Sequence, residues 1–143
     1  MIEIVNTSIN VERVIDSVAS PSAGAIDIFI GTTRNNSGGE NVLYLEYEVY
    51  QDMALETINK LINEAYATWN LCKVSFVHRV GRVDIGEASI VIAVSSPHRK
   101  EAFEACRFLI DNVKKTVPIW KKEYFDDDYN WVEGEQNKKG DGV

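Results

Sequence analysis

The sequence predicts an α+β fold in which mostly antiparallel strands form a sheet and helices pack on a face of it. Segments with apolar residues at every second position alternate with segments of helical, 3.6-residue periodicity. Their order is β-α-β-β-α-β-β-α-β-β, so pairs of successive strands separate the helices. The length of 143 residues is sufficient to bury a core without metal or disulfide cross-links.

Three strands and one short helix are expected in the first 50 residues. Residues 1–6 alternate weakly, as in a strand, and Asn10 can cap a helix whose apolar face spans residues 11–18. A second strand covers residues 25–33. One face of this strand carries Ile26, Ile28 and Ile30, and the other carries Asp27 and Phe29.

A polar, glycine-rich segment, residues 35–39, follows this strand and is expected to be a mobile loop. The third strand is VLYLEYEVY at residues 42–50, which has high β propensity. One of its faces would carry Leu43, Leu45, Tyr47 and Val49. Glu46 and Glu48 share the other face, where a solvated surface is a simpler explanation than acid–base catalysis.

The middle of the chain predicts a helix, two strands and a connection. The helix covers residues 52–69 and has an apolar stripe. A strand at residues 72–80 carries His78 on its apolar face, which favours a hydrogen-bonded core histidine over a ligand. The glycines of residues 81–88 suit a connection. Residues 89–95 form the most apolar strand, which is therefore expected at the centre of the sheet.

The last long helix is expected to be capped by Ser96, to have Pro97 in its first turn and to end before Pro118. Its buried side would carry Phe103, Cys106, Ile110, Val113 and Val117. Residues 119–125 then look extended, with an acidic turn at 126–128 before a strand at 129–133. Ile119, Lys121 and Glu123 share one face of the extended segment, and Trp120, Lys122 and Tyr124 share the other.

Composition narrows the class of protein. Residues 1–134 are expected to form a single domain, and residues 135–143 a disordered tail, because the tail lacks apolar anchors. A net charge of −7 argues against bulk affinity for nucleic acid or an anionic membrane. Without a signal-peptide pattern or a long apolar run, a cytoplasmic protein is expected. Cys72 and Cys106 lie in apolar segments and are expected to be buried, reduced thiols.

Basic residues recur at the ends of the predicted elements, namely Arg34, the pair His98 and Arg99, Lys114 and Lys121. A helix start already carries partial positive charge, so cations gathered there suit an anion. Their joint task would be to hold a phosphate and to neutralise charge that develops on a reacting oxygen or sulfur. The sequence has no nucleotide-binding loop, His/Cys metal cluster or serine-nucleophile motif, so no metal or cofactor is expected.

Two of these basic residues also have a purely structural explanation. Arg34 is equally compatible with a solvated loop arginine. Lys114 fits the preference of lysine for the last turn of a helix. That preference does not extend to Lys121, which lies beyond the proline. A lysine on the face of Ile119 is expected to be partly desolvated, and so to serve as a proton donor or base as well as a charge.

Several motifs together resemble one family. The matching stretches are GAIDIFIGTTRNNSGG, LEYEVYQDMA, VSFVHRVGRVDIGEASIVIAVSSPHRKEAFEAC, KKTVPIWKKE and WVEG, which cover roughly residues 24 to 134. They contain the patterns FxGxxR, VGxVxxGE, SxHR at a helix start and KxxxPxWKxE. With these motifs the chain resembles the large, catalytic subunits of molybdopterin synthase. The combination is far more specific than any single pattern.

The resemblance implies a sulfur-insertion enzyme of molybdenum cofactor biosynthesis. Members of that family convert a cyclic pyranopterin monophosphate, precursor Z, into molybdopterin. The sulfur arrives as a thiocarboxylate on the C-terminal Gly-Gly of a small ubiquitin-like carrier subunit. The implied assembly is a heterotetramer with a central homodimer of large subunits. The implied fold is an α/β hammerhead joined to a small antiparallel subdomain.

The resemblance also implies roles for individual residues. Lys114 and Lys121 match the catalytic pair near the end of the carrier tail. Arg34, His98 and Arg99 match residues that bind the phosphate and pterin side of the substrate, and Phe29 and Glu123 match positions near the same pocket. Two rival functions remain open. One is a non-catalytic module that binds a ubiquitin-like tail by strand pairing, and the other is an unrelated phosphate-ester hydrolase that needs no carrier.

Overall fold

The structure, a computed structural model, describes residues 1–125 and 129–133. The α+β class is confirmed. The elements are β1 (Ile2–Val5), α1 (Val11–Ser17), β2 (Ala25–Thr32), β3 (Asn36–Ser37), β4 (Glu40–Val49), α2 (Gln51–Thr68), β5 (Lys73–Arg79), β6 (Gly81–Asp84), β7 (Ala88–Ser96), α3 (Arg99–Thr116), β8 (Ile119–Phe125) and β9 (Tyr129–Glu133). Both the predicted turn at 126–128 and the predicted disordered tail, 135–143, lie outside the described residues. Within the described part, no helix is long and apolar enough to cross a membrane.

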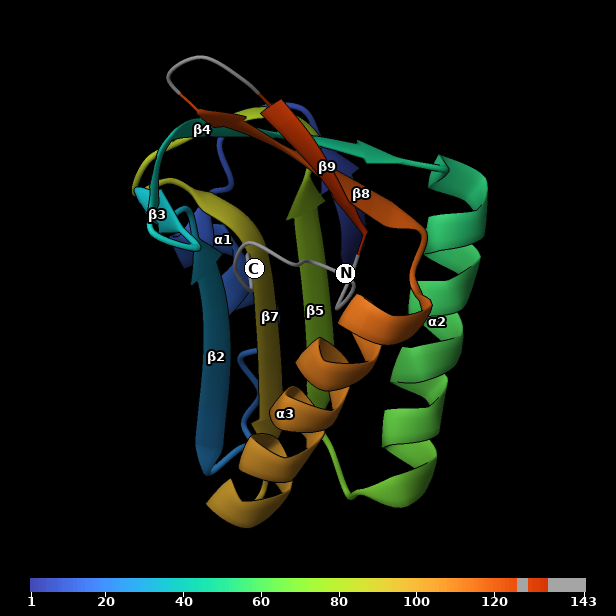
Figure 1. Cartoon of the computed structure of the whole chain (residues 1–143). Helices are drawn as coiled ribbons and strands as arrows, with labels where there is room; N and C mark the ends of the chain where they lie inside the picture. The colour runs from blue at the N-terminus through green and yellow to red at the C-terminus, as the bar shows by residue number, and fades with distance from the viewer. Residues whose placement is uncertain (126–128, 134–143) are drawn as a thin grey trace.

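The helices pack on a four-stranded sheet in the order β1-β5-β7-β2. The prediction of a central strand at residues 89–95 is confirmed, because β7 lies between β5 and β2 and nearly all of its residues are buried. The pairs β5–β7 and β7–β2 are antiparallel, and β1–β5 is parallel. Helices α2 and α3 cover one face, and α1 covers the other (Figure 1).

The core follows this arrangement. The larger cluster contains Phe76, Ile90, Ile92 and Val94 from the sheet, packed against apolar residues of α2 and α3. The smaller cluster lies under α1, where Val14 and Val18 contact Val77, Val91 and Ala93. Alternate residues of β5 and β7 therefore serve opposite faces, as the two-residue period of a strand requires.

A second sheet crosses the end of the first (Figure 1). Its order is β3-β4-β8-β9, and β6 also pairs with β4. All of these pairs are antiparallel. The inner face carries a separate apolar cluster of Val42, Leu45, Tyr47, Val83 and Phe125.

The predictions for two glycine-containing segments are corrected by this sheet. The expected loop at 35–39 forms most of a hairpin in which Gly38 and Gly39 have positive φ, and the expected connection at 81–88 begins with β6.

Three apolar faces differ from the prediction. Leu43 is exposed and Val42 is buried, because the β4–β8 register shifts between Val42 and Tyr44 and reverses the alternation. Ile26 and Ile30 are exposed, because β2 is an edge strand that α1 covers only in part. Phe103 is also exposed, on the outer side of α3. Local periodicity does not reveal these tertiary effects.

The start of α3 also differs from the prediction. Ser96 is still the last residue of β7, where it pairs with Ala25, and the N-cap of α3 is His98. The Ser96 hydroxyl donates to the His98 carbonyl instead of accepting from a helical N–H. Gly24 donates to the Ser96 carbonyl at 3.0 Å, and a Cβ at Gly24 would collide with the Pro97 carbonyl oxygen. The β7–α3 junction is therefore tightly held.

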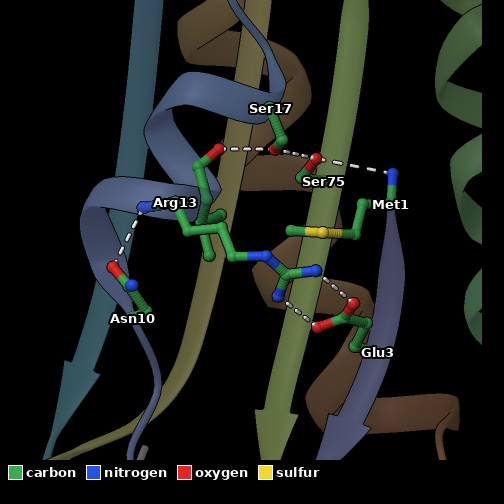
Figure 2. Close-up of polar contacts among 7 residues, drawn as sticks. Met1, Glu3, Asn10, Arg13, Ser17 and Ser75 are labelled. Carbon is green, nitrogen blue, oxygen red and sulfur yellow. Dashed lines mark hydrogen bonds and ion pairs between the residues drawn. The ribbon is translucent and has the colours of Figure 1, made fainter.

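Polar contacts join α1 to the neighbouring strands (Figure 2). As predicted, Asn10 caps α1, and its side chain accepts from the Arg13 N–H at 3.1 Å. The Arg13 guanidinium makes two 2.9 Å bonds to the Glu3 carboxylate in β1. The Ser17 hydroxyl donates to Val14 O at 2.6 Å and lies 2.6 Å from the Ser75 hydroxyl of β5. These contacts fix the helix on its side of the sheet.

Candidate active site

Lys121 and Glu123 come from β8, whose residues alternate between the two faces of the second sheet. The predicted alternation of this strand is confirmed, because Lys121 and Glu123 are buried while Lys122 and Tyr124 are only half-buried. The exposed fraction is 6% for Lys121 and 2% for Glu123. Charged residues are rarely buried to this extent unless they are paired or have a function.

Strand β4 supplies the opposing wall of this inner face. Tyr47 is the register partner of Lys121, and Leu45 is the register partner of Glu123. Side chains directly opposite each other on antiparallel strands share a face, so these four residues form one patch. Tyr47 and Leu45 are as deeply buried as the two charged residues. The patch therefore combines apolar walls with one cation and one anion.

A small open depression lies beside this patch. Its lining residues are Thr32, Arg34, Asn36, Leu45 and Glu123. They come from the end of β2, the hairpin that follows it, β4 and β8. The depression brings together Arg34 and Glu123, two residues that the sequence singled out. An exposed guanidinium next to a buried carboxylate can bind a ligand that carries both an anionic group and hydrogen-bond donors.

Glu123 has an unusual environment. Its Oε1 atom is buried and has no hydrogen-bond partner among the residues that the structure describes. The same holds for the Tyr47 hydroxyl. Burial raises the pKa of Tyr47 well above its ordinary value. The Ser89 hydroxyl lowers this pKa, and the Glu123 carboxylate raises it. The Ser89 hydroxyl donates to Gly31 O at 3.3 Å, and no Tyr47–Ser89 hydrogen bond of ordinary geometry is formed.

His78 lies beneath Tyr47. It is 2% exposed, and its ring meets the Tyr47 ring edge-on with centroids 5.1 Å apart. The prediction of a hydrogen-bonded core histidine is confirmed, because Nδ1 lies 2.8 Å from the Arg79 carbonyl oxygen. A carbonyl only accepts, so Nδ1 carries the proton. Burial lowers the pKa of His78 to about 4, so the ring is neutral near pH 7.

The remaining predicted site residues do not line this depression. Lys114 is half-buried in the last turn of α3, together with Lys115. Phe29 is half-buried in the middle of β2, against the larger core cluster.

His98 and Arg99 are exposed at the start of α3, at the opposite end of the four-stranded sheet from Arg34 (Figure 1). Because Ala25 pairs with Ser96 and Thr32 pairs with Ala88, the two ends of β2 are separated by seven residues, or about 23 Å. A single chain does not bring all the predicted residues together.

Sequence reasoning missed Thr32, Asn36, Leu45 and Tyr47 as neighbours of the site. The inward direction of Leu45 and Tyr47 was predicted, but their pairing with Glu123 and Lys121 was not. The sequence did carry a signal for this pairing, because residues 42–50 and residues 119–125 both show the alternation of a strand. The missing information was the register between β4 and β8.

Neither cysteine takes part in this arrangement. Both are free thiols, Cys106 buried and Cys72 half-buried. Burial raises the pKa of the Cys106 thiol to about 12, and nearby Asp27 contributes to the rise, so the thiol is unreactive near pH 7. Within residues 1–125 and 129–133, no group of three or more His, Cys, Asp or Glu side chains is placed to hold a metal ion.

The fold is of the α+β class with two sheets. The inner face of the second sheet carries the buried charged residues Lys121 and Glu123, which are suited to binding charged ligands. The chain belongs to the family described as MoaE protein, whose family model matches residues 4–116. It is 48% identical over 132 residues to molybdopterin synthase catalytic subunit 1 of Aedes aegypti, covering 92% of this chain and 85% of the relative.

Solved structures show the same likeness. Molybdopterin synthase from Staphylococcus aureus superposes with a TM-score of 0.87 at 37% identity, covering 91% of this chain and 95% of that one. A Helicobacter pylori complex of subunits 1 and 2 of molybdopterin-converting factor shares the fold, with a TM-score of 0.78 at 18% identity and coverage of 97% and 92%. The resemblance found in the motifs is confirmed, and the chain is a sulfurtransferase of molybdenum cofactor biosynthesis.

Proposed function

We propose that the chain converts a cyclic pyranopterin monophosphate into molybdopterin by inserting two sulfurs, which a small ubiquitin-like carrier delivers as a C-terminal thiocarboxylate. The observation that carries the proposal is the buried Lys121 and Glu123 beside the depression that Arg34 lines. A phosphate and a thiocarboxylate repel each other, so one site for both needs fixed cations. The reaction takes place in the cytoplasm.

In the proposed mechanism, the thiocarboxylate sulfur attacks a substrate carbon that carries an oxygen substituent, while Lys121 and Lys114 orient the carrier tail. The new C–S bond replaces the C–O bond, and the oxygen leaves with the bonding electron pair, either as water after protonation or still attached to the phosphate. Negative charge that develops during transfer is stabilised by the Lys121 ammonium, which acts more strongly in a buried site than in water. Arg34 binds the phosphate or pterin side of the substrate. Water then cleaves the acyl C–S bond of the thioester that joins carrier and substrate, so the sulfur stays on the substrate as a thiol and the carrier is left with a plain carboxylate. Each delivery supplies one sulfur, so each product consumes two carriers.

The carrier is inferred from chemistry and from similarity. Strand β8 and the following strand lie beside the patch, so an extended carrier tail can reach Lys121 along them. The Helicobacter pylori structure is a complex of two subunits of molybdopterin-converting factor, which supports a small partner subunit for this chain as well.

We also propose that two copies of the chain form a dimer and that each site is shared between them. His98 and Arg99 lie at the opposite end of the sheet from Arg34, so one chain alone cannot place them on the same phosphate. In an isologous dimer, the start of α3 of one copy can reach the depression of the other. With a shared site, predicted residues that lie at opposite ends of one chain can meet on one substrate.

The decisive experiment supplies the purified protein with the pyranopterin and a carrier that ends in either a thiocarboxylate or a plain carboxylate. We expect product only with the thiocarboxylate, measured by chromatography of the pterin. No product with either carrier, despite tight carrier binding, would favour the non-catalytic tail-binding module. Turnover of the pyranopterin without any carrier would favour a hydrolase.

The shared site predicts that two inactive variants restore each other. Arg34→Ala and His98→Ala should each lose turnover as pure proteins. After mixing and subunit exchange, half of the dimers are mixed and one of their two sites is intact, so about one quarter of wild-type turnover should return. Turnover of the mixture no greater than that of the separate variants would show that the site is not shared.

A further inference from the structure

Two deeply buried polar atoms of the inner patch lack partners among the described residues. They are the Tyr47 hydroxyl and Oε1 of Glu123, in side chains that are 3% and 2% exposed. A buried polar atom without a hydrogen bond costs roughly 1–3 kcal/mol, and more if the group is charged. Native proteins keep such atoms rarely, and they then call for an explanation. Here one atom is a donor and the other an acceptor.

Strand geometry places the two side chains on the same face. Glu123 pairs with Leu45, and Tyr47 is the next residue of β4 on the same face. Tyr47 and Glu123 are therefore diagonal neighbours, which is within reach of an aromatic side chain. The electrostatic effect of Glu123 on the Tyr47 phenol agrees with this proximity. Glu123 lines the depression, whereas Tyr47 is not among its lining residues.

The Tyr47 ring has a fixed support. Its edge-on contact with the His78 ring, at 5.1 Å, comes from the other sheet. His78 is itself held by the 2.8 Å bond from Nδ1 to Arg79 O. Such an aromatic contact contributes about 0.5–1.5 kcal/mol beyond burial. The direction of the phenol is thus set by the scaffold and does not depend on the ligand.

We propose that Tyr47 is a positioning residue that holds the Glu123 carboxylate toward the depression when substrate binds. The inference rests on the proposed function for the substrate that is used. When substrate enters, the Tyr47 hydroxyl donates to one carboxylate oxygen of Glu123. The other oxygen accepts from hydrogen-bond donors of the substrate. The role is distinct from that of Lys121, because Tyr47 acts only through Glu123.

The test replaces Tyr47 by Phe, which removes the hydroxyl and keeps the ring on His78. The variant should fold, because removing an unpartnered buried hydroxyl is nearly neutral. We expect KM for the pyranopterin to rise about tenfold, because one charge-assisted hydrogen bond is weakened. The kcat and the KM for the carrier should stay within about twofold of wild type. Tyr44→Phe is the matched control, because Tyr44 is on the opposite face of β4, stacked on Tyr124. It should change none of these constants.

Two outcomes would overturn the proposal. One is an unchanged KM for the pyranopterin in Tyr47→Phe, and the other is a loss confined to kcat together with a lower Tm, as a structural role predicts. The double variant with Glu123→Met, which has no oxygen acceptor, sharpens the test. If Tyr47 acts through Glu123, removing its hydroxyl in the Met background should raise KM no further. A further tenfold rise would contradict the proposal.

A measurement on the free protein separates this proposal from the proposed function. With tyrosine labelled with 13C at Cζ, the Tyr47 resonance is assigned from the Tyr47→Phe spectrum. Glu123→Gln should shift the Tyr47 resonance more than that of Tyr44, because the carboxylate lies near Tyr47. A shift in Tyr47 with no turnover by the wild type would retain the pair and reject the reaction. No shift in Tyr47 would reject the pair itself.

Discussion

The two sheets bury their inner faces equally well but with different chemistry. Under the four-stranded sheet, the larger core cluster consists of apolar side chains, among them Phe76 and Leu109 with no exposed surface. Under the second sheet, the apolar residues Leu45 and Val83 share the interior with Lys121 and Glu123. Burial stabilises the first region, whereas in the second the buried charges oppose part of the stability gained from apolar contacts.

This difference indicates a division of labour. A protein keeps buried charged groups where their removal would cost function, and the surrounding scaffold must tolerate the loss of stability. Here the four-stranded sheet with its helices is that scaffold. If the division holds, substitutions in the first region should change stability without changing the chemistry of folded molecules, and substitutions in the second should do the opposite.

The largest effect is expected for Phe76→Ala in the first region. The side chain is fully buried, so its loss should lower the free energy of unfolding by about 3–5 kcal/mol. Phe103→Ala is the control, because Phe103 is 56% exposed and its loss should change stability by at most about 0.5 kcal/mol. Urea denaturation measures both. Similar losses in the two variants would contradict the assignment of the core.

The next effect tests His78, which joins the two regions. Its pKa is about 4 in the folded protein, whereas an unperturbed histidine has a pKa of 6.5, so between these values the unfolded state binds the extra proton. Stability should therefore fall by up to about 3 kcal/mol as pH decreases from about 6.5 to about 4. The measurement is urea denaturation at several pH values.

His78→Gln should remove this part of the pH dependence, because glutamine does not titrate. His98→Gln is the matched control, since His98 is the other histidine of the chain and is exposed. It should keep the wild-type slope. If the slope persists in His78→Gln, the acid sensitivity originates elsewhere, and His78 is not the titrating link between the two sheets.

The smallest effect is expected from Lys121→Met in the second region, and it concerns the activation free energy of the reaction instead of the free energy of unfolding. Methionine keeps the length of the side chain and removes its charge, so turnover should fall about 100-fold, the loss typical of one charge-stabilising group. Lys122→Met is the control on the opposite face of β8 and should stay within about twofold of wild type. Full turnover by Lys121→Met with normal carrier binding would remove Lys121 from the mechanism.

Much of the fold follows from local patterns. The alternation in residues 119–125 predicted that Lys121 and Glu123 share one face of the strand, and the apolar run at 89–95 predicted the central strand. These predictions succeed because successive side chains in a strand point to opposite faces of the sheet. The cap at Ser96 was wrong, because pairing with Ala25 extends β7 and the hydroxyl bonds to His98. A nonlocal pairing there outweighs a local preference.

The site was less predictable than the fold. Sequence patterns identified Arg34 and Glu123, which line the same depression. They did not reveal that His98 lies at the other end of the sheet, because that separation depends on the antiparallel pairing of β2 with β7. Tyr47 was predicted to be an inward residue, but its neighbours depend on the β4–β8 register. Register and sheet order are long-range properties that one strand does not encode.

The alternation in β8 has a consequence for insertions and deletions. Strand β8 carries lysine on both faces, Lys121 inward and Lys122 outward, but glutamate only on the inner face. A one-residue slip would exchange the faces. A lysine would still point inward, but Tyr124 or another outward residue would replace Glu123. The Glu123 carboxylate therefore requires one register for β8. Insertions and deletions between homologous chains should occur at the ends of β8 and not within it.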